Sequence, residues 1–201
     1  MIEKTLILLK PDCVMRGLIG EVISRIERTG LKVIGMKMIH ADRDFAQKHY
    51  PVTEEWYTKV GKNTLDDSKK YGISAKETIG TEEPAEIGKL VHKWNVNFLT
   101  LGPVIAIVLE GAHAIESIRK IAGDTVPNKA LPGTIRGDLA TASALYSNIK
   151  NRAIYNLIHT SKNKEEAEYG LPICSTIREG ANCLSLNPKR FATTLGNLPL
   201  G

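Results

Sequence analysis

Residues 3–39 read EKTLILLKPDCVMRGLIGEVISRIERTGLKVIGMKMI, and their pattern of apolar residues indicates the type of fold. The apolar run at 4–10 has β-compatible residues and the length of a buried strand. Within 18–26 the apolar residues recur at helical spacing, and Gly30 stands where a helix C-cap belongs. Residues 31–40 alternate imperfectly between apolar and polar side chains, which favours a second strand. The stretch therefore predicts a strand–helix–strand unit.

The rest of the chain continues this alternation. The pattern predicts helices at 42–50, 87–95, 112–122 and 140–150, a strand at 104–109 and a short apolar segment at 154–158. Residues 51–85 are polar and aperiodic, so we expect an insertion or an extended loop there. Residues 124–139, rich in Pro, Gly and Thr, predict an ordered loop. Short strands interleaved with helices indicate a compact α/β sandwich.

The composition is that of an ordinary globular domain: 201 residues, 42% hydrophobic and 24% charged. The 27 Lys and Arg exceed the 22 Asp and Glu, and the net charge of +5 suits an anionic substrate without indicating nucleic acid. Cys13, Cys174 and Cys183 are widely separated and predict reduced thiols, with neither a disulfide framework nor a zinc site. No apolar run is long enough for a membrane span or a signal-peptide core, so we expect a cytoplasmic protein.

A few polar groups next to apolar segments are candidates for chemistry: Lys10 at the end of the first predicted strand, Arg119, Arg136 in PGTIRGD (132–138), and His159 in NLIHTS (156–161). Each has an ordinary structural interpretation when taken alone, such as a solvated lysine or an Arg136–Asp138 pair that braces a loop. Together they suit a polyphosphate, because guanidinium groups match phosphate oxygens and a neutral imidazole is a nucleophile. Neither GxGxxG nor GxxxxGK[ST] occurs, so side chains would have to bind the phosphates. The remaining histidines have no comparable polar neighbours in the sequence: His40, His49, His92 and His113.

Residues 2 to about 170 resemble the nucleoside diphosphate kinase family, on the strength of KPDCVMRGLIGE (10–21), PGTIRGD and a later NLIHTS. The resemblance implies an α/β (α+β) fold, a ferredoxin-like βαββαβ sandwich whose four-stranded antiparallel sheet is covered by helices. It implies one domain over 1–201, with an insertion at about 51–85 and a C-terminal tail at about 172–201.

The resemblance also implies an activity, the ping-pong transfer of the γ-phosphate of a nucleoside triphosphate, typically ATP, to a nucleoside diphosphate through phospho-His159. Mg²⁺ would enter on the nucleotide phosphates. The positions that match the family's substrate-binding residues are Lys10 and Asn156 at the sugar hydroxyl, Arg119, Thr125 and Arg136 at the phosphates, Tyr50 near the histidine, Leu90 against the base, and Ser161. Trp56, Tyr57 and Phe98 remain alternatives for the aromatic residue that stacks on the base.

Two departures from the family pattern stand near His159. The family's His-Gly-Ser-Asp is His-Thr-Ser-Lys here, and Thr160 would be strained if its φ had to be positive. The family glutamate that orients the histidine falls, counted without gaps, on Gly170. Glu168, or Glu166, lies close enough in the sequence to supply that carboxylate instead.

Two rival functions follow from these features. A nucleotide-binding regulatory or scaffold protein of weak or no activity is supported by the departures and by the insertion. A nucleic-acid-binding protein is suggested only by the basic charge, and nucleic acid is the less favoured partner. The resemblance implies a homo-oligomer, a hexamer with a tetramer as the alternative, and no membrane partner.

Overall fold

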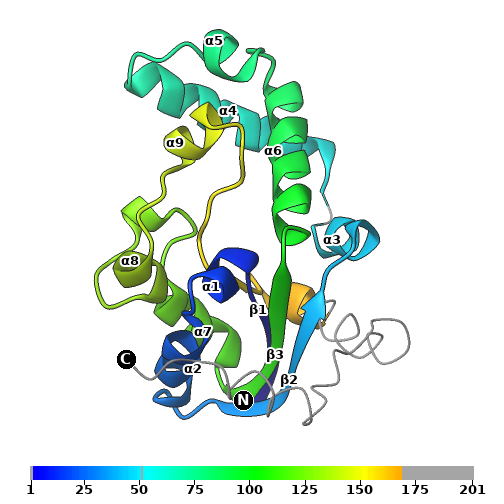
Figure 1. Ribbon diagram of the computed structural model, residues 1–201, viewed down its shortest axis with the longest axis vertical. Coiled ribbons are helices and arrows are strands. Elements are labelled where there is room, and N and C mark those ends of the chain that lie inside the picture. Colours follow the sequence, from blue (N-terminus) through cyan, green and yellow to red (C-terminus); the bar gives the residue numbers. More distant parts are fainter. Residues whose placement is uncertain (1, 51, 169–201) are drawn as a thin grey trace, which may run out of the picture.

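The computed structural model describes residues 2–50 and 52–168, which form a four-stranded antiparallel sheet with the order β2-β3-β1-β4 (Figure 1). Its strands are β1 (Ile2–Leu9), β2 (Lys32–His40), β3 (Pro103–Ala112) and β4 (Ile158–Thr160). β1 lies between β3 and β4, and β2 pairs with β3 at an edge. The predicted ferredoxin-like sandwich is confirmed.

Helices account for most of the remaining described chain. They are α1 (Pro11–Met15), α2 (Ile19–Glu27), α3 (Arg43–His49), α4 (Glu54–Lys70), α5 (Ala75–Ile79), α6 (Pro84–Leu99), α7 (Ala114–Ala122), α8 (Ile135–Leu139) and α9 (Ala144–Ile149), with a 3₁₀ turn η1 (Pro127–Lys129) and a helical stretch at 164–168. None of the helices in the described ranges is long and apolar enough to cross a membrane.

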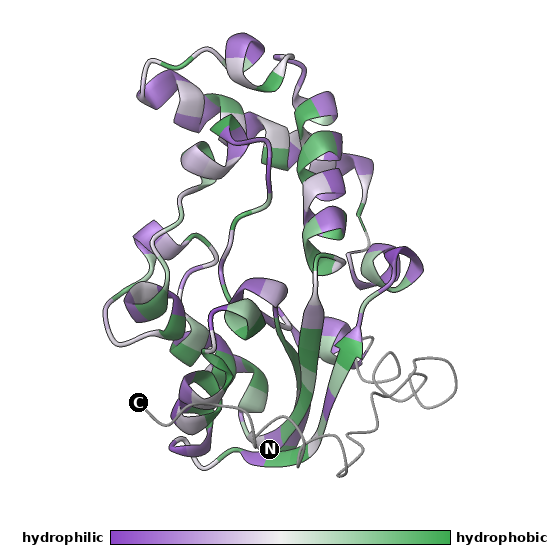
Figure 2. Cartoon of the chain, in the orientation of Figure 1, coloured by the Kyte–Doolittle hydropathy of each residue, from purple (hydrophilic) through white to green (hydrophobic). Residues whose placement is uncertain are grey.

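The two faces of the sheet are covered differently. Alternate residues of β1, Ile7 and Leu9, pack into the main core with α2 and α7. Leu6 and Leu8 point to the opposite face and pack with Phe45 of α3. β3 is hydrophobic along most of its length, as expected for a central strand with both faces covered (Figure 2). The second face matters for the site because β4 presents His159 opposite Leu8.

The expectation of an extended loop within 51–85 is wrong, because this region forms α4 and α5. Thr53 and Ser74 cap the two helices, accepting hydrogen bonds from the backbone N–H groups of Trp56 (3.2 Å) and Glu77 (3.3 Å). The buried residues of α4 are Gly61, Thr64 and Ser68. Because the buried face of α4 consists of small and polar residues, the sequence shows no apolar helical period that would predict this helix.

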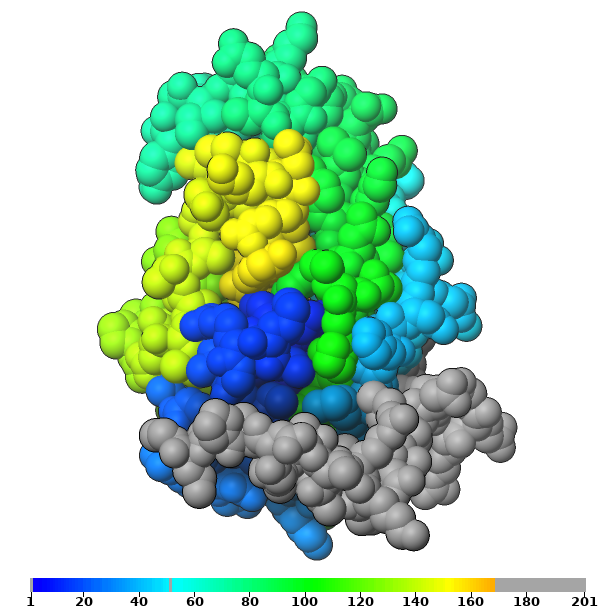
Figure 3. Space-filling view, in the orientation of Figure 1, coloured from blue at the N-terminus to red at the C-terminus, as the bar shows by residue number. Residues whose placement is uncertain are grey.

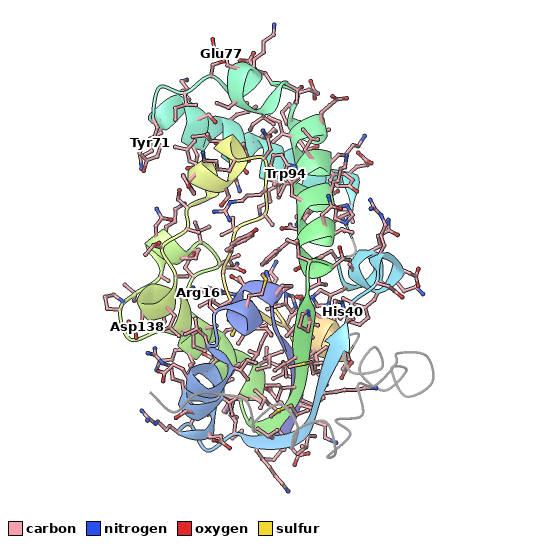
Figure 4. The ribbon with its side chains drawn as sticks, in the orientation of Figure 1. Arg16, His40, Tyr71, Glu77, Trp94 and Asp138 are labelled. Atoms are coloured by element: carbon pink, nitrogen blue, oxygen red, sulfur yellow. The ribbon has the colours of Figure 1, made fainter. Side chains whose placement is uncertain are left out.

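The helices of this region build an extension beyond the end of the sheet, with Glu77 at its far tip and Tyr71 at its side, where α4 ends (Figures 1 and 4). α4 crosses α6, and α9, from a later part of the chain, packs against α4 and α5. The Nδ2 atom of Asn148 donates to Oγ1 of Thr64 at 3.3 Å inside this contact. In the space-filling view α9 and the segment after it fill the space between α6 and the α8 region (Figure 3).

Glycine makes the close crossing of α4 and α6 possible. A Cβ atom at Gly88 of α6 would overlap the backbone of Tyr57, and one at Gly61 of α4 would overlap the backbone of Pro84. Backbone atoms cannot move aside as the end of a flexible side chain can. A methyl group at either position must therefore push the two helices apart.

We therefore expect Gly88→Ala to lower the free energy of unfolding by about 1–3 kcal/mol, measured by urea denaturation. Gly20→Ala is the matched control. Gly20 lies in α2, where an added Cβ would meet no atom within 4 Å, so alanine there should stabilise by about 0.5–1 kcal/mol through helix propensity alone. Equal effects of the two substitutions would contradict this account of the crossing.

Candidate active site

The segment that leads into His159 contains a strained turn at Leu157. Leu157 is fully buried and has a φ of +67°. The N–H of Ile158 donates to the carbonyl oxygen of Asn156 at 2.7 Å, closing a three-residue γ-turn. A bulky residue in this conformation costs of order 1–3 kcal/mol and persists only where its surroundings impose it.

Residues at the end of β1 and the start of α1 impose the turn from one side. The carboxylate of Asp12 accepts the N–H of Leu157 at 3.0 Å with Oδ2 and the N–H of Cys13 at 3.0 Å with Oδ1. The N–H of Lys10 donates to the carbonyl oxygen of Leu157 at 2.8 Å. Burial raises the pKa of Asp12, although these amides and the charge of Lys10 oppose the rise.

Arg136 holds the turn from the other side. Its buried guanidinium donates to three carbonyl oxygens, those of Asn156 (3.1 Å), Gly123 (2.8 Å) and Ile158 (2.5 Å). Burial, together with the nearby Arg119, lowers the pKa of Arg136 to about 10 despite neighbouring carboxylates. Three of its five N–H groups support the backbone, which leaves two for a ligand.

Lys10 and Asn156 form a buried polar pair beside this turn. Nζ of Lys10 donates to Oδ1 of Asn156 at 2.8 Å, and Nδ2 of Asn156 donates to the carbonyl oxygen of Thr125 at 2.8 Å. Burial and the charge of Arg136 lower the pKa of Lys10 to about 8, with Asp12 opposing the change. The arrangement keeps a cation at the base of the site at neutral pH.

His159 projects from β4 with one ring nitrogen already engaged. Its Nε2 lies 3.4 Å from Oε1 of Glu166, whose Oε2 accepts the N–H of Lys162 at 2.9 Å. Burial and the charges of Lys10 and Arg136 lower the pKa of His159 more strongly than Glu166 raises it, so the imidazole is neutral at pH 7. Burial would raise the pKa of Glu166, but its bonds to His159 and Lys162 and nearby positive charge lower it overall.

The carboxylate beside His159 therefore belongs to Glu166 and not to Glu168, which points to solvent and pairs with Lys164 at 3.7 Å. Gly170 and the tail at 172–201 lie outside the described residues. Thr160 does not have a positive φ, so the strain considered for it does not arise. Oγ of Ser161 donates to the carbonyl oxygen of Leu6 at 3.3 Å and thereby ties β4 to β1.

One neighbour of His159 was not predicted from the sequence. The ring of His49, the last residue of α3, lies 4.4 Å from the ring of His159 between centroids, with an interplanar angle of 75°. No pattern in the sequence marked His49, because it reaches the site by packing of α3 on the sheet. The ring centroid of Tyr50, which was expected near the histidine, lies 6.3 Å from that of His159. Burial raises the pKa of the Tyr50 phenol.

The other predicted residues lie at different depths. Arg119 and Thr125 are exposed, and the charge of Arg119 acts on both Arg136 and Glu166. Leu90 is half-buried on α6. Phe98 is buried and stacks on Tyr155 at 4.6 Å, whereas Trp56 and Tyr57 pack against His92. The aromatic residue that stacks on the base therefore stays unassigned.

Chemically, the site offers a neutral imidazole with one nitrogen held by a carboxylate, surrounded by cations. Such a set can bind phosphate oxygens and accept a phosphoryl group. Over residues 2–50 and 52–168 no three His, Cys, Asp or Glu side chains are grouped so that they could hold a metal ion.

Comparisons with known proteins agree with this chemistry. The family model "Nucleoside diphosphate kinase" matches residues 3–63 and 75–176. The nucleoside diphosphate kinase of Pyrobaculum aerophilum is 42% identical over 167 residues, which are 83% of this chain and 91% of that protein. That of Pyrococcus furiosus is 41% identical over 83% of this chain and 79% of its own length.

Two solved structures are similar as well. An NDP kinase from Pyrobaculum aerophilum has a TM-score of 0.82 and 39% identity, over 86% of this chain and 95% of that one. The nucleoside-diphosphate kinase from Borrelia burgdorferi, solved as a transition state mimic with bound vanadate and ADP, has a TM-score of 0.65 and 39% identity, over 86% of each chain.

Because the pKa of Lys10 is lowered, an anion that contacts its Nζ would bind with an affinity that depends on pH. Above about pH 8 the free protein loses the charge of Lys10, and binding a polyphosphate must then be coupled to uptake of a proton. We expect the dissociation constant for ADP, measured by calorimetry, to rise by up to about tenfold per pH unit between pH 8.5 and 10. A dissociation constant for ADP that does not change from pH 7 to 10 would contradict a role for Lys10 in binding the phosphates.

Proposed function

The chain belongs to the nucleoside diphosphate kinase family and has that family's phosphotransferase function, and from this premise we propose that Nδ1 of His159 is the atom that carries the phosphoryl group. The observation that supports this most directly is the contact of Nε2 with Glu166. A carboxylate accepts a hydrogen bond and donates none, so it keeps the proton on Nε2 and leaves the lone pair on Nδ1.

The cations around His159 support a division of roles. We propose that Lys10 and Asn156 contact the sugar hydroxyl and the adjacent phosphate, since they form one hydrogen-bonded pair. Arg119 and Thr125, which are exposed, and the two remaining N–H groups of Arg136 would bind the β- and γ-phosphates. Mg²⁺ prefers phosphate oxygens and would be carried into the site by the nucleotide as part of the substrate.

The reaction then consists of two in-line displacements. Nδ1 of His159 attacks the γ-phosphorus of a nucleoside triphosphate, the N–P bond forms, and the bond to the β–γ bridging oxygen breaks as the diphosphate leaves. A terminal oxygen of a second nucleoside diphosphate attacks the same phosphorus and the N–P bond breaks. Donor and acceptor use one site in turn, so ping-pong kinetics follow. The charge that develops on the transferring oxygens meets arginines already in position.

A phosphoenzyme assay tests this proposal. The protein is mixed with Mg²⁺ and γ-labelled ATP, denatured in base, and chased with GDP in a parallel sample. We expect an acid-labile label that His159→Ala abolishes and that leaves as GTP. No label in protein that binds ATP would contradict the proposal.

The role of Glu166 has a matched control on the same helical stretch. Glu166→Gln is expected to slow phosphorylation by about tenfold or more, because the amide can also stabilise the wrong tautomer. Glu168→Gln, at a residue that pairs only with Lys164 within the described chain, should leave the rate unchanged. Equal rates for the two variants would remove Glu166 from the mechanism.

The rival function, a regulatory protein that binds nucleotide, is tested in the same experiment. Label on His159 that GDP does not remove would support the regulator. The contact between His159 and Glu166 argues against the regulator. The family glutamate falls on Gly170 when the residues are counted without gaps, and Glu166 supplies a carboxylate beside His159 instead.

Assembly is a separate part of the proposal. The edge strand β2 exposes Met36 (50%) and Met38 (47%), and in the described chain β2 pairs with β3 alone. Exposed apolar residues on an unpaired edge suit contact with a second copy of the chain. We propose a homo-oligomer, a hexamer rather than a tetramer, which sedimentation velocity would distinguish from each other and from a monomer.

A further inference from the structure

His49 is buried beside the proposed nucleophile without a hydrogen bond for one of its nitrogens. Its residue exposure is 9%, and its Nε2 has no hydrogen-bond partner within the described chain. A buried donor or acceptor left unpaired is costly, and such atoms are rare in folded proteins. An apolar ring of the same shape would fill the position without that cost, so the nitrogen calls for an explanation.

The surroundings of His49 are apolar or aromatic on the sides away from the nucleophile. Phe45 stacks parallel to it with centroids 6.1 Å apart, and the ring of Tyr50 meets it edge-on at 4.8 Å. The remaining ring neighbour is His159 at 4.4 Å. Burial lowers the pKa of His49 well below its ordinary value, and repulsion from His159 in its protonated form and from Lys10 lowers it further, so the ring is neutral.

The residue after His49 also has a buried polar atom without a hydrogen-bond partner in the described chain. The phenol oxygen of Tyr50 is also buried and has no hydrogen-bond partner among residues 2–50 and 52–168. Tyr50 follows His49 in the chain, and its ring meets the ring of His159 edge-on. Two unpaired polar atoms on adjacent residues, both packed around one imidazole, indicate a shared polar partner that arrives at that imidazole.

We propose that Nε2–H of His49 donates a hydrogen bond to an oxygen of the phosphoryl group as that group moves between the nucleotide and Nδ1 of His159. The inference rests on the proposed function and adds a contact from α3, which lies across the sheet from the arginine-bearing helices α7 and α8 (Figure 1). A neutral donor adds to the binding of the oxygens without repelling the cations already present. The proton stays on His49 throughout, and no bond other than those already described is formed or broken.

The test separates the nitrogen from the ring. His49→Phe keeps an aromatic ring against Phe45 and His159 and deletes Nε2, and His49→Gln keeps a donor N–H at a comparable reach. For His49→Phe we expect phosphorylation by ATP and dephosphorylation by GDP, each measured in a single turnover, to slow by about a hundredfold, the lower end of the effect typical of losing one such donor. The dissociation constant for ADP should stay within about twofold, because ADP brings no transferring phosphoryl group.

His49→Gln should recover most of the lost rate, and thermal unfolding of His49→Phe should occur at or above the wild-type temperature, since an unpaired buried atom has been removed. His40→Gln is the control, because His40 is exposed at the end of β2 (Figure 4) and should leave every rate unchanged.

Wild-type rates in a folded His49→Phe variant would overturn the inference and leave the proposed function intact. Equal slowing in the Phe and Gln variants would also overturn it, because the ring and not the donor would then be required. Absence of a label on His159 in the wild-type protein would instead overturn the proposed function on which the inference rests.

Discussion

The site depends on one constraint, the γ-turn at Leu157 that directs the chain into β4. A leucine with a φ of +67° does not adopt this conformation unaided. It is held from three directions, by the carboxylate of Asp12, by the backbone N–H of Lys10 and by the guanidinium of Arg136. The same residues that impose the turn also supply charge to the site, so the shape of the backbone and the electrostatics around His159 are set together.

This constraint links distant parts of the sequence. The hydrogen bond from Leu157 to Asp12 joins positions 145 residues apart, and the bond from Arg136 to the carbonyl oxygen of Ile158 closes the other side of the turn. The sheet completes the arrangement, because antiparallel pairing of β4 with β1 sets His159 opposite Leu8, on the face that α3 covers. His159 is thus placed by regular structure, and its Nε2 lies 3.4 Å from the carboxylate of Glu166, which accepts the N–H of Lys162.

Local pattern was enough to predict most elements of the sandwich and to single out several of the residues that lie around His159 in the structure. Apolar runs and helical stripes predicted the strands and helices that form the core, and motifs around Lys10, Arg136 and His159 led to the family. The helices within 51–85 were missed because α4 buries Gly61, Thr64 and Ser68, which leave no hydrophobic period. His49 was missed because its role arises from tertiary packing, and Glu166 was distinguished from Glu168 only by the three-dimensional path of the chain after β4.

The proposed reaction requires that His159 be a neutral imidazole with its proton on Nε2 and a free lone pair on Nδ1. Nitrogen-15 NMR of the free protein labelled at histidine measures this directly, with His159→Gln used to assign the signals. At pH 7 we expect one protonated ring nitrogen, Nε2, and an unprotonated Nδ1. A proton on Nδ1, or an imidazolium at that pH, would contradict it.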